Sequence, residues 1–156
     1  MERCQHGHIV CADTILARAK EVGLRRTKAL EVVVEALASV GIPLPLNELE
    51  KNPEVAGICD RTTLFRLLNR LGEHGLVRRL GLHQRAAYFT LAMPGGHHDY
   101  LICKECGSVE ILGVDCPVKA LEEEVARTTG YTQLYHELEI YGVCAKCGDL
   151  KAQGGG

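Results

Sequence analysis

Apolar residues recur every three or four positions through the first half of the chain, which is the spacing of one face of an α-helix. Leu30, Val33, Val34 and Leu37 are the most regular set. Residues that favour helix ends bound each such stretch, so the pattern predicts helices at residues 13–23, 27–41, 43–53 and 61–75. The expected boundary residues are Asp13, Gly23, Thr27, Gly41, Pro43, Pro45, Pro53, Asp60 or Thr62, and Gly75.

Alternation of apolar and polar residues, which is typical of half-buried strands, follows further along the chain. It predicts a hairpin of strands at residues 76–80 and 86–91, and later strands at residues 100–102, 108–112 and 134–143. A last helix is expected from Pro117 to Gly130, with Cys116 as its N-cap. Helices followed by a basic hairpin predict a winged helix-turn-helix.

The predicted helix at residues 61–73 has two different faces. Leucines 64, 67, 68 and 71 form an apolar stripe, while threonine, arginine and an aromatic ring lie off it. Such a surface suits the DNA major groove, because arginine binds guanine or phosphate and apolar groups contact thymine methyls. Phe65 has an alternative role as a core residue. The candidate DNA-binding residues are Thr62, Thr63, Phe65, Arg66 and Arg70 on the helix, and Arg78, Arg79 and Arg85 on the hairpin.

Charge is divided unequally along the chain. The net charge is −2, but residues 1–92 hold 13 Lys+Arg against 10 Asp+Glu, whereas residues 93–156 hold 5 against 10. Six arginines and one acidic residue, Glu73, lie between Arg61 and Arg85. A basic segment in an acidic protein is a candidate nucleic-acid surface, although an ordinary solvated face has the same composition.

The shifts in charge and composition meet at residues 92–96, a Pro- and Gly-containing stretch that we interpret as a linker. We expect an α+β protein with a winged-helix DNA-binding domain at residues 1–91, including an extension at 1–12. A small α/β zinc-containing dimerisation domain is expected at residues 97–151, followed by a disordered tail at 152–156.

Two Cys-x-x-Cys pairs, each followed by glycine, flank the last third of the chain. Cys103, Cys106, Cys144 and Cys147 supply four sulfurs, which suits tetrahedral Zn²⁺ in a closed structural site. Two disulfides or a redox motif are the alternatives. The chain has no signal peptide, so we expect a reducing cytoplasm, where disulfides rarely persist.

Further metal-ligand residues remain after this site is filled. His97, His98 and Asp99 precede the first pair, and His136 lies on an apolar strand face. A second, regulatory metal is therefore a hypothesis, with a core histidine as the alternative for His136. A further possible cluster at the N-terminus consists of Cys4, His6, His8 and Cys11, for which the alternative is a flexible terminus.

Three motifs together resemble the ferric uptake regulator family over nearly the whole chain, from about residue 12 to 150. They are Asp60-Arg-Thr-Thr-Leu-Phe-Arg-Leu-Leu68, His97-His-Asp-x-Leu-Ile-Cys-x-x-Cys-Gly107 and His136-Glu-Leu-Glu-Ile-Tyr-Gly-Val-Cys-x-x-Cys147. The resemblance implies cytoplasmic homodimeric repressors that bind palindromic operators when loaded with metal. It also implies strand pairing across the dimer that buries residues such as Leu138 and Ile140.

Carried over position by position, the resemblance assigns the four cysteines to the structural zinc. His97, Asp99 and His136 match three ligands of a regulatory site. Its fourth ligand, a helix carboxylate, falls near Lys119, and Glu122 or Glu123 is one turn later. Cys116-Pro117 is also a dipeptide of some haem-regulated proteins, but a proline in the first turn of a helix explains it structurally.

The family's interdomain sensing site is less well matched. Pro43, Phe89 and Tyr100 stand where the family usually has ligands, and Tyr100 also weakens a peroxide-sensor interpretation. Three explanations compete. Metal sensing has moved to the His97–Asp99–His136 site, or it is largely lost, or it uses a sensing site rebuilt from other residues. The candidates for the rebuilt site are His98, His83, Glu110, Cys4, His6, His8 and Cys11.

These observations predict a metal-responsive repressor of metal-uptake genes, not an enzyme, with structural Zn²⁺ and a regulatory Fe²⁺ or Zn²⁺. Its partners are double-stranded DNA and a second copy of the chain, with no membrane. A zinc hydrolase or deaminase is disfavoured because the sequence lacks HExxH and the deaminase PCxxC signature. The alternatives are a zinc-ribbon adaptor that binds no DNA, or a family member that senses peroxide or another metal.

Overall fold

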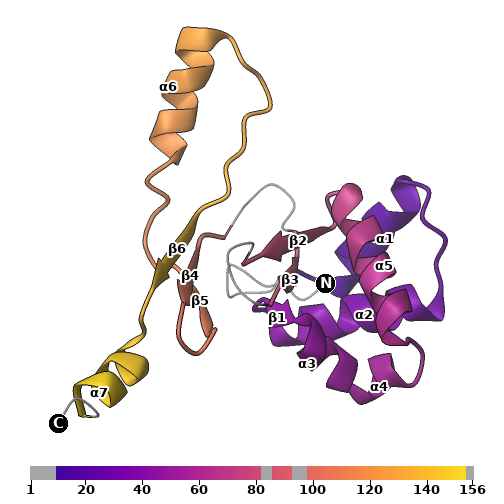
Figure 1. Cartoon of the computed structure of the whole chain (residues 1–156). Helices are drawn as coiled ribbons and strands as arrows, with labels where there is room; N and C mark the ends of the chain where they lie inside the picture. Colours follow the sequence, from indigo (N-terminus) through magenta and orange to yellow (C-terminus); the bar gives the residue numbers. More distant parts are fainter. Residues whose placement is uncertain (1–9, 82–85, 93–97, 154–156) are drawn as a thin grey trace. The chain divides into compact units, whose positions relative to one another are not determined.

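A computed structural model of the 156-residue chain describes residues 10–81, 86–92 and 98–153. The chain forms two compact units, Met1–Gly96 and His97–Gly156, and each is described by itself (Figure 1). Within the described residues, no helix is both long enough and apolar enough to cross a bilayer.

The first unit combines helices with a small antiparallel sheet. Strand β3 (Tyr88–Leu91) lies at the centre of the sheet, between β1 (Leu44–Pro45) and β2 (Val77–Leu80). Phe89 is opposite Leu44 on one side and Arg79 on the other. The helices of this unit are α1 (Ala12–Glu21), α2 (Lys28–Val40), α3 (Leu46–Lys51), α4 (Pro53–Ala56) and α5 (Arg61–Glu73). Helices followed by the β2–β3 hairpin form a winged helix-turn-helix.

Two of the expected N-caps are confirmed. Thr27 Oγ1 accepts a hydrogen bond from the Leu30 backbone N–H at 3.1 Å, and Asp60 Oδ1 accepts one from Thr63 N–H at 2.7 Å. Both bonds satisfy amides that have no partner within their helix. The Thr63 amide also lowers the pKa of Asp60, because it stabilises the carboxylate.

Three details of the predicted helices are wrong. Cys11, in extended conformation, occupies the N-cap position of α1. Asp13 lies inside the first turn, where its negative charge interacts favourably with the helix dipole. The third helix begins at Leu46 and not at Pro43; Pro45 occupies its N-cap position, as expected, and also belongs to the edge strand β1, which tolerates a missing N–H. Pro53 begins the extra helix α4, with Asn52 as its cap, because proline is compatible with a first helical turn.

The core of the first unit contains residues of all five of its helices and of strands β2 and β3. Leu64, Leu68 and Leu71 bury one stripe of α5, whereas Leu67 is half-buried. The two phenylalanines of the chain have opposite environments: Phe89 is 1% exposed and Phe65 is 39% exposed. The core role considered for Phe65 is therefore filled by Phe89.

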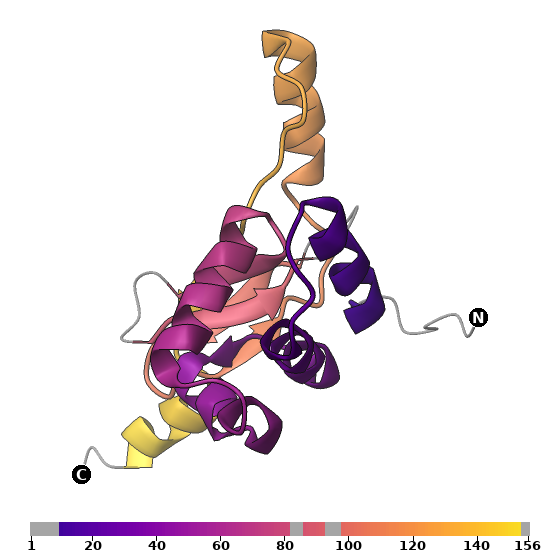
Figure 2. The same cartoon turned by 90° about the vertical axis from the view of Figure 1, so that its right-hand side faces the viewer.

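The second unit is built on a three-stranded sheet in the order β5-β4-β6. Strand β4 (Tyr100–Cys103) pairs antiparallel with β5 (Val109–Ile111) and parallel with β6 (Glu139–Gly142). Helix α6 (Lys119–Thr129) contributes no buried residue, and in two views it stands apart from the sheet (Figures 1 and 2). Helix α7 (Ala145–Gln153) follows β6.

Three expectations for the second unit differ from the structure. Only residues 139–142 of the long strand predicted at 134–143 form a strand. Val118, not Cys116, occupies the N-cap of α6, because the helix begins two residues later than predicted. Helix α7 forms where no further helix was expected, and it includes Ala152 and Gln153 of the tail that was expected to be disordered. The other residues of that tail lie outside the described ranges.

We expect Phe89→Ala to lower the free energy of unfolding of the first unit by about 3–5 kcal/mol, because it removes a fully buried ring and leaves a cavity. Phe65→Ala is the matched control, and its loss should be much smaller because the ring is partly solvated. Urea unfolding followed by circular dichroism measures both, and equal losses would contradict this account of the core.

Candidate metal centre and nucleic-acid interface

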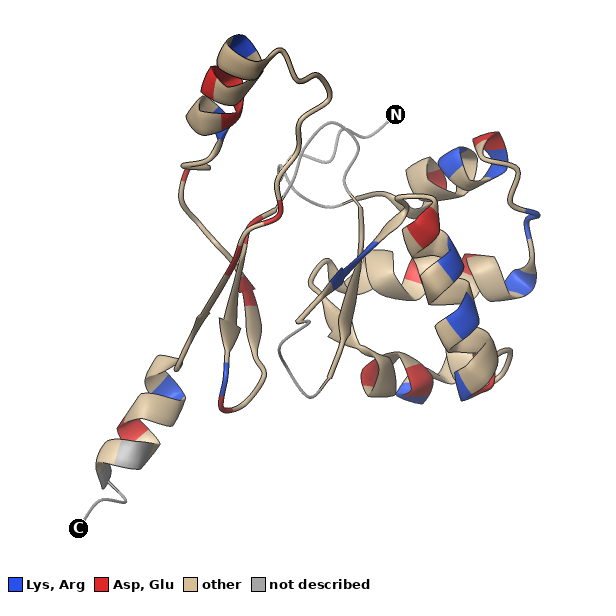
Figure 3. Cartoon of the chain, turned by 45° about the horizontal axis from the view of Figure 1, so that its top comes forward, with Lys and Arg blue, Asp and Glu red and all other residues tan. Residues whose placement is uncertain are grey.

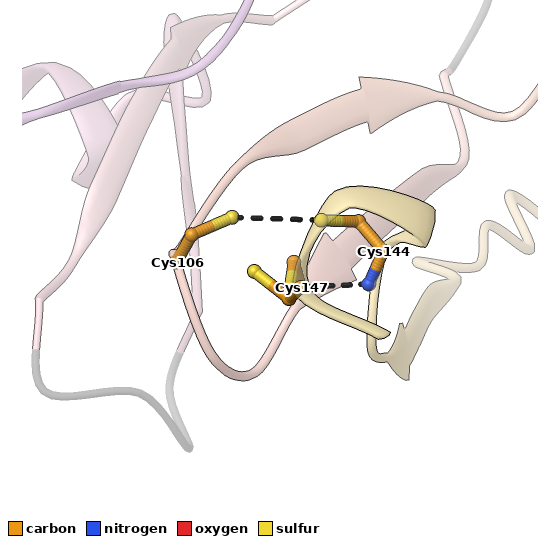
Figure 4. A group of neighbouring side chains, drawn as sticks. Cys106, Cys144 and Cys147 are labelled. Atoms are coloured by element: carbon orange, nitrogen blue, oxygen red, sulfur yellow. Dashed lines mark hydrogen bonds between the residues drawn. The ribbon is translucent and has the colours of Figure 1, made fainter. Parts of the chain in front are cut away.

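Four cysteine side chains converge beside the β4–β6 strand pair. Cys103 ends β4 and Cys106 lies in the following turn, where Gly107 has φ +73°. Cys144 follows β6, and Cys147 lies in the first turn of α7. All four sulfurs lie within 4.8 Å of one another. Figure 4 shows Cys106 and Cys144 pointing toward each other, with their sulfurs 3.8 Å apart.

This arrangement fits a zinc ion. Tetrahedral coordination with Zn–S bonds of ~2.3 Å places the sulfurs about 3.8 Å apart. The same separation is far longer than a disulfide bond of about 2.05 Å, and the described cysteines are free thiols. With four protein ligands, no position remains open to substrate, so the site is structural in character.

Local hydrogen bonds prepare some of these thiols for metal binding. Backbone N–H groups of Cys106 and then Cys144 lower the pKa of Cys103 to about 6, and the Cys144 N–H donates to Cys103 Sγ at 3.3 Å. The Ser108 hydroxyl, 3.3 Å from Cys106 Sγ, lowers the pKa of Cys106. The thiols of Cys144 and then Cys106 raise the pKa of Cys147 to about 12. Without a cation the cluster therefore resists ionisation of Cys147, which a bound Zn²⁺ would favour.

A second cluster lies at the opposite end of the β4–β6 pair. The ligand atoms of Asp99, Cys116 and His136 all lie within 4.8 Å of one another. His136 Nε2 is 3.1 Å from Cys116 Sγ and 3.8 Å from Asp99 Oδ1. Glu122 Oε1 lies 2.9 Å from the other ring nitrogen, Nδ1. Asp99 and His136 are thus brought together as the sequence predicted, while Glu122 faces the opposite side of the ring.

Cys116 is a member of this cluster that its local sequence did not predict, because the following Pro117 suggested a helix cap. The sequence did offer one indication of this role, because Cys116 belongs to neither Cys-x-x-Cys pair. His97, the other expected residue of the regulatory site, lies outside the described residues.

The remaining candidate ligands do not join these clusters within the part of the chain that the structure describes. His98 lies 6.1 Å from the Tyr100 ring, measured between centroids, and Glu110 is exposed on β5. Cys11 is exposed before α1. Cys4, His6, His8 and His83 lie outside the described residues.

Helix α5 presents its polar side to solvent. Thr62, Thr63, Phe65, Arg66 and Arg70 are all exposed, opposite the buried leucines. Figure 3 shows basic positions along this helix and on β2. Such a face can enter a major groove, where arginine donates to guanine or phosphate.

The hairpin contributes less than the sequence suggested. Arg79 is exposed on β2, but Arg78 is half-buried, so less of its side chain is available to DNA. Arg85 lies outside the described residues.

A winged helix-turn-helix joined to a unit with a four-thiol metal cluster defines a class of metal-containing DNA-binding regulators. The sequence profile of the ferric uptake regulator family matches residues 21–141. The chain therefore belongs to the ferric uptake regulator family, whose members are transcription regulators and not enzymes.

Individual relatives agree with this assignment. The chain is 29% identical over 153 residues to the ferric uptake regulation protein of Campylobacter jejuni, covering 90% of this chain and 93% of that protein. The Escherichia coli protein of the same name is 36% identical over 89 residues, covering 57% of this chain and 58% of the relative, so that match spans little more than half of its length.

A solved structure supports the α+β fold class. The ferric uptake regulator of Vibrio cholerae superposes with a TM-score of 0.61 at 28% identity, covering 82% of this chain and 98% of that one.

We expect Cys106→Ser to lose most of the zinc that purified wild-type protein carries, about one ion per chain, because it removes one of four ligands. In the wild type, zinc affinity should fall more steeply with decreasing pH below about 6, because Cys103 must then also lose a proton before it binds the ion. Metal content after gel filtration and a chromophoric zinc indicator measure both effects.

Cys59→Ala is the control, because Cys59 is buried in the core of the first unit. It should keep its zinc. Full zinc retention by Cys106→Ser would rule out the four-thiol site.

Proposed function

We propose that this protein is a metal-responsive repressor of metal-uptake genes that binds palindromic operators as a homodimer. The observation that carries the proposal is the solvent-exposed face of α5, with Thr62, Thr63, Phe65, Arg66 and Arg70 opposite a buried leucine stripe. The V. cholerae relative is described as having DNA-binding domains that rearrange, which agrees with this role.

The chemistry of α5 supports sequence-specific binding. The exposed Arg66 and Arg70 supply donors for guanine or phosphate, and threonine methyl groups and the Phe65 ring supply apolar contacts for thymine. Arg79 on the hairpin adds contact with the phosphate backbone, which gives affinity without specificity. A reducing cytoplasm suits this protein, because its metal ligands include thiolates.

Solvent-exposed apolar residues in the second unit support dimerisation. Strand β6 is at the edge of its sheet, and Leu101, Ile140 and Val143 are 38%, 42% and 44% exposed. Helix α6 buries no residue within its own chain. A second copy that pairs along β6 would cover these residues and give the assembly two α5 helices, one for each half-site of a palindromic operator.

The regulatory ion is iron or zinc in this proposal, and its ligands include Asp99 and His136. Asp99 lies on the segment that leads into β4, and His136 lies on the segment that leads into β6. An ion bound between them would therefore stabilise the second unit, which forms the proposed dimer interface. Metal loading would then favour the dimer conformation that fits the operator.

The direct test is binding to a duplex that the wild-type protein enriches from a random DNA pool. We expect a mild chelator that leaves the four-thiol zinc in place to weaken binding about 5–150-fold, the usual range of allosteric coupling. Arg66→Ala should weaken it by about 1–3 kcal/mol and lower the slope of affinity against salt. Fluorescence anisotropy measures both.

Arg127→Ala is the control, because it removes the same charge from an exposed position on α6. It should bind DNA like the wild type. If no duplex is enriched, the zinc-ribbon adaptor becomes the better interpretation. If a duplex is enriched but Arg66→Ala binds it like the wild type, the exposed face of α5 is not the DNA-binding surface. If the chelator has no effect, the protein binds DNA but does not respond to metal.

Replacing Ile140 with lysine should shift the protein from dimer to monomer, weakening self-association about tenfold or more, because it buries a charge in the proposed interface. Val22→Lys is matched in exposure, at 43%, and lies in the first unit, so it should remain dimeric. Sedimentation equilibrium distinguishes the two, and a dimer that tolerates Ile140→Lys would show that the interface lies elsewhere.

A further inference from the structure

Cys116 lies in a position that its neighbouring sequence does not explain. It does not cap α6, and its sulfur instead faces the His136 ring at 3.1 Å. Asp99, which is 6% exposed, faces the same ring nitrogen. Three different ligand atoms, a sulfur, a nitrogen and an oxygen, thus surround one point at the start of the β4–β6 pair.

Strand pairing fixes two of these ligands. Strands β4 and β6 are parallel, with Tyr100 opposite Glu139, so the segments that enter them are neighbours. The Tyr100 N–H also donates to the Leu138 carbonyl at 3.1 Å, which extends the pairing toward Asp99 and His136. Cys116 reaches the same point from the connection between β5 and α6.

Glu122 has a different part in this cluster. Its carboxylate contacts Nδ1 of His136, whereas Cys116 and Asp99 face Nε2. A carboxylate beside Nδ1 favours the ring proton on that nitrogen and leaves the Nε2 lone pair directed at the cluster, which is how metal-binding histidines are commonly oriented. Glu122 is therefore a positioning residue and not a ligand in this arrangement.

We propose that Cys116, Asp99 and His136 bind a zinc-class ion through a thiolate, a carboxylate and an imidazole. One thiolate and one carboxylate balance the charge of a divalent cation, and three protein ligands leave a fourth position for water or another residue. A thiolate favours Zn²⁺ over Fe²⁺ and Mn²⁺, for which oxygen and nitrogen ligands are better suited. This inference rests on the proposed function for its regulatory meaning, and it selects zinc as the ion sensed.

The test uses the full chain with its four-thiol site already occupied by zinc, and adds Co²⁺ as a spectroscopic substitute. The wild type should bind one further ion per chain and develop a near-ultraviolet thiolate-to-cobalt charge-transfer band. Cys116→Ser should lose the band and bind Zn²⁺ at least about tenfold more weakly. Zinc content of the same samples shows that the first site has not exchanged.

Two further variants separate ligand from positioning roles. Cys116→Asp should still bind metal, without the charge-transfer band and with a smaller preference for Zn²⁺ over Mn²⁺. Glu122→Gln should keep the band but lose about 10–100-fold in affinity, because the ligand remains and only its orientation suffers. Cys59→Ala is the cysteine control and should resemble the wild type in every measurement.

The possible results are distinct. A wild type without the band, or a Cys116→Ser variant that keeps it, would overturn the thiolate ligand, even if DNA binding still responds to metal. A band that depends on Cys116, together with operator affinity that is indifferent to metal, would support this site and refute the metal-switched function.

Discussion

The parallel pairing of β4 with β6 is the interaction on which the second unit depends. It joins segments about forty residues apart in sequence, with Tyr100 opposite Glu139 and Cys103 opposite Gly142. Each end of this strand pair carries a cluster of metal-ligand residues, four thiols at one end and Asp99, Cys116 and His136 at the other. Metal bound at either cluster would therefore stabilise this strand pairing and be stabilised by it, because each brings together the segments that the other requires.

The two units bury very different amounts of apolar surface. Most buried apolar residues belong to the first unit, whose core joins five helices and two strands. The described part of the second unit buries only three apolar residues, Tyr100, Ile102 and Cys103. A unit of this size with so little core needs another source of stability, and metal ions and a partner chain are the usual ones. The exposed Ile140 and Val143, and a helix α6 with no buried residue, agree with such a dependence.

This difference suits a regulator in which one part is constant and the other responds. The well-packed first unit holds the exposed residues of α5 in place through the buried leucine stripe of that helix. In the second unit, a closed set of four sulfurs favours permanent binding, while the mixed ligands of the second cluster favour an ion that exchanges. The two clusters thus differ in chemistry although they share the same strands.

Sequence alone was sufficient for the features that depend on local spacing. Helical periodicity and capping side chains located α2 and α5, the Cys-x-x-Cys pairs identified the four thiols, and the leucine stripe separated the buried face of α5 from Arg66 and Arg70. Alternation overestimated the last strand, since only residues 139–142 find a partner in β4. Tertiary structure decided that Phe89 and not Phe65 fills the core, and that Cys116 faces His136 instead of capping a helix. Local sequence could not settle either point, because both depend on which distant segments the parallel strand pair and the helix packing bring together.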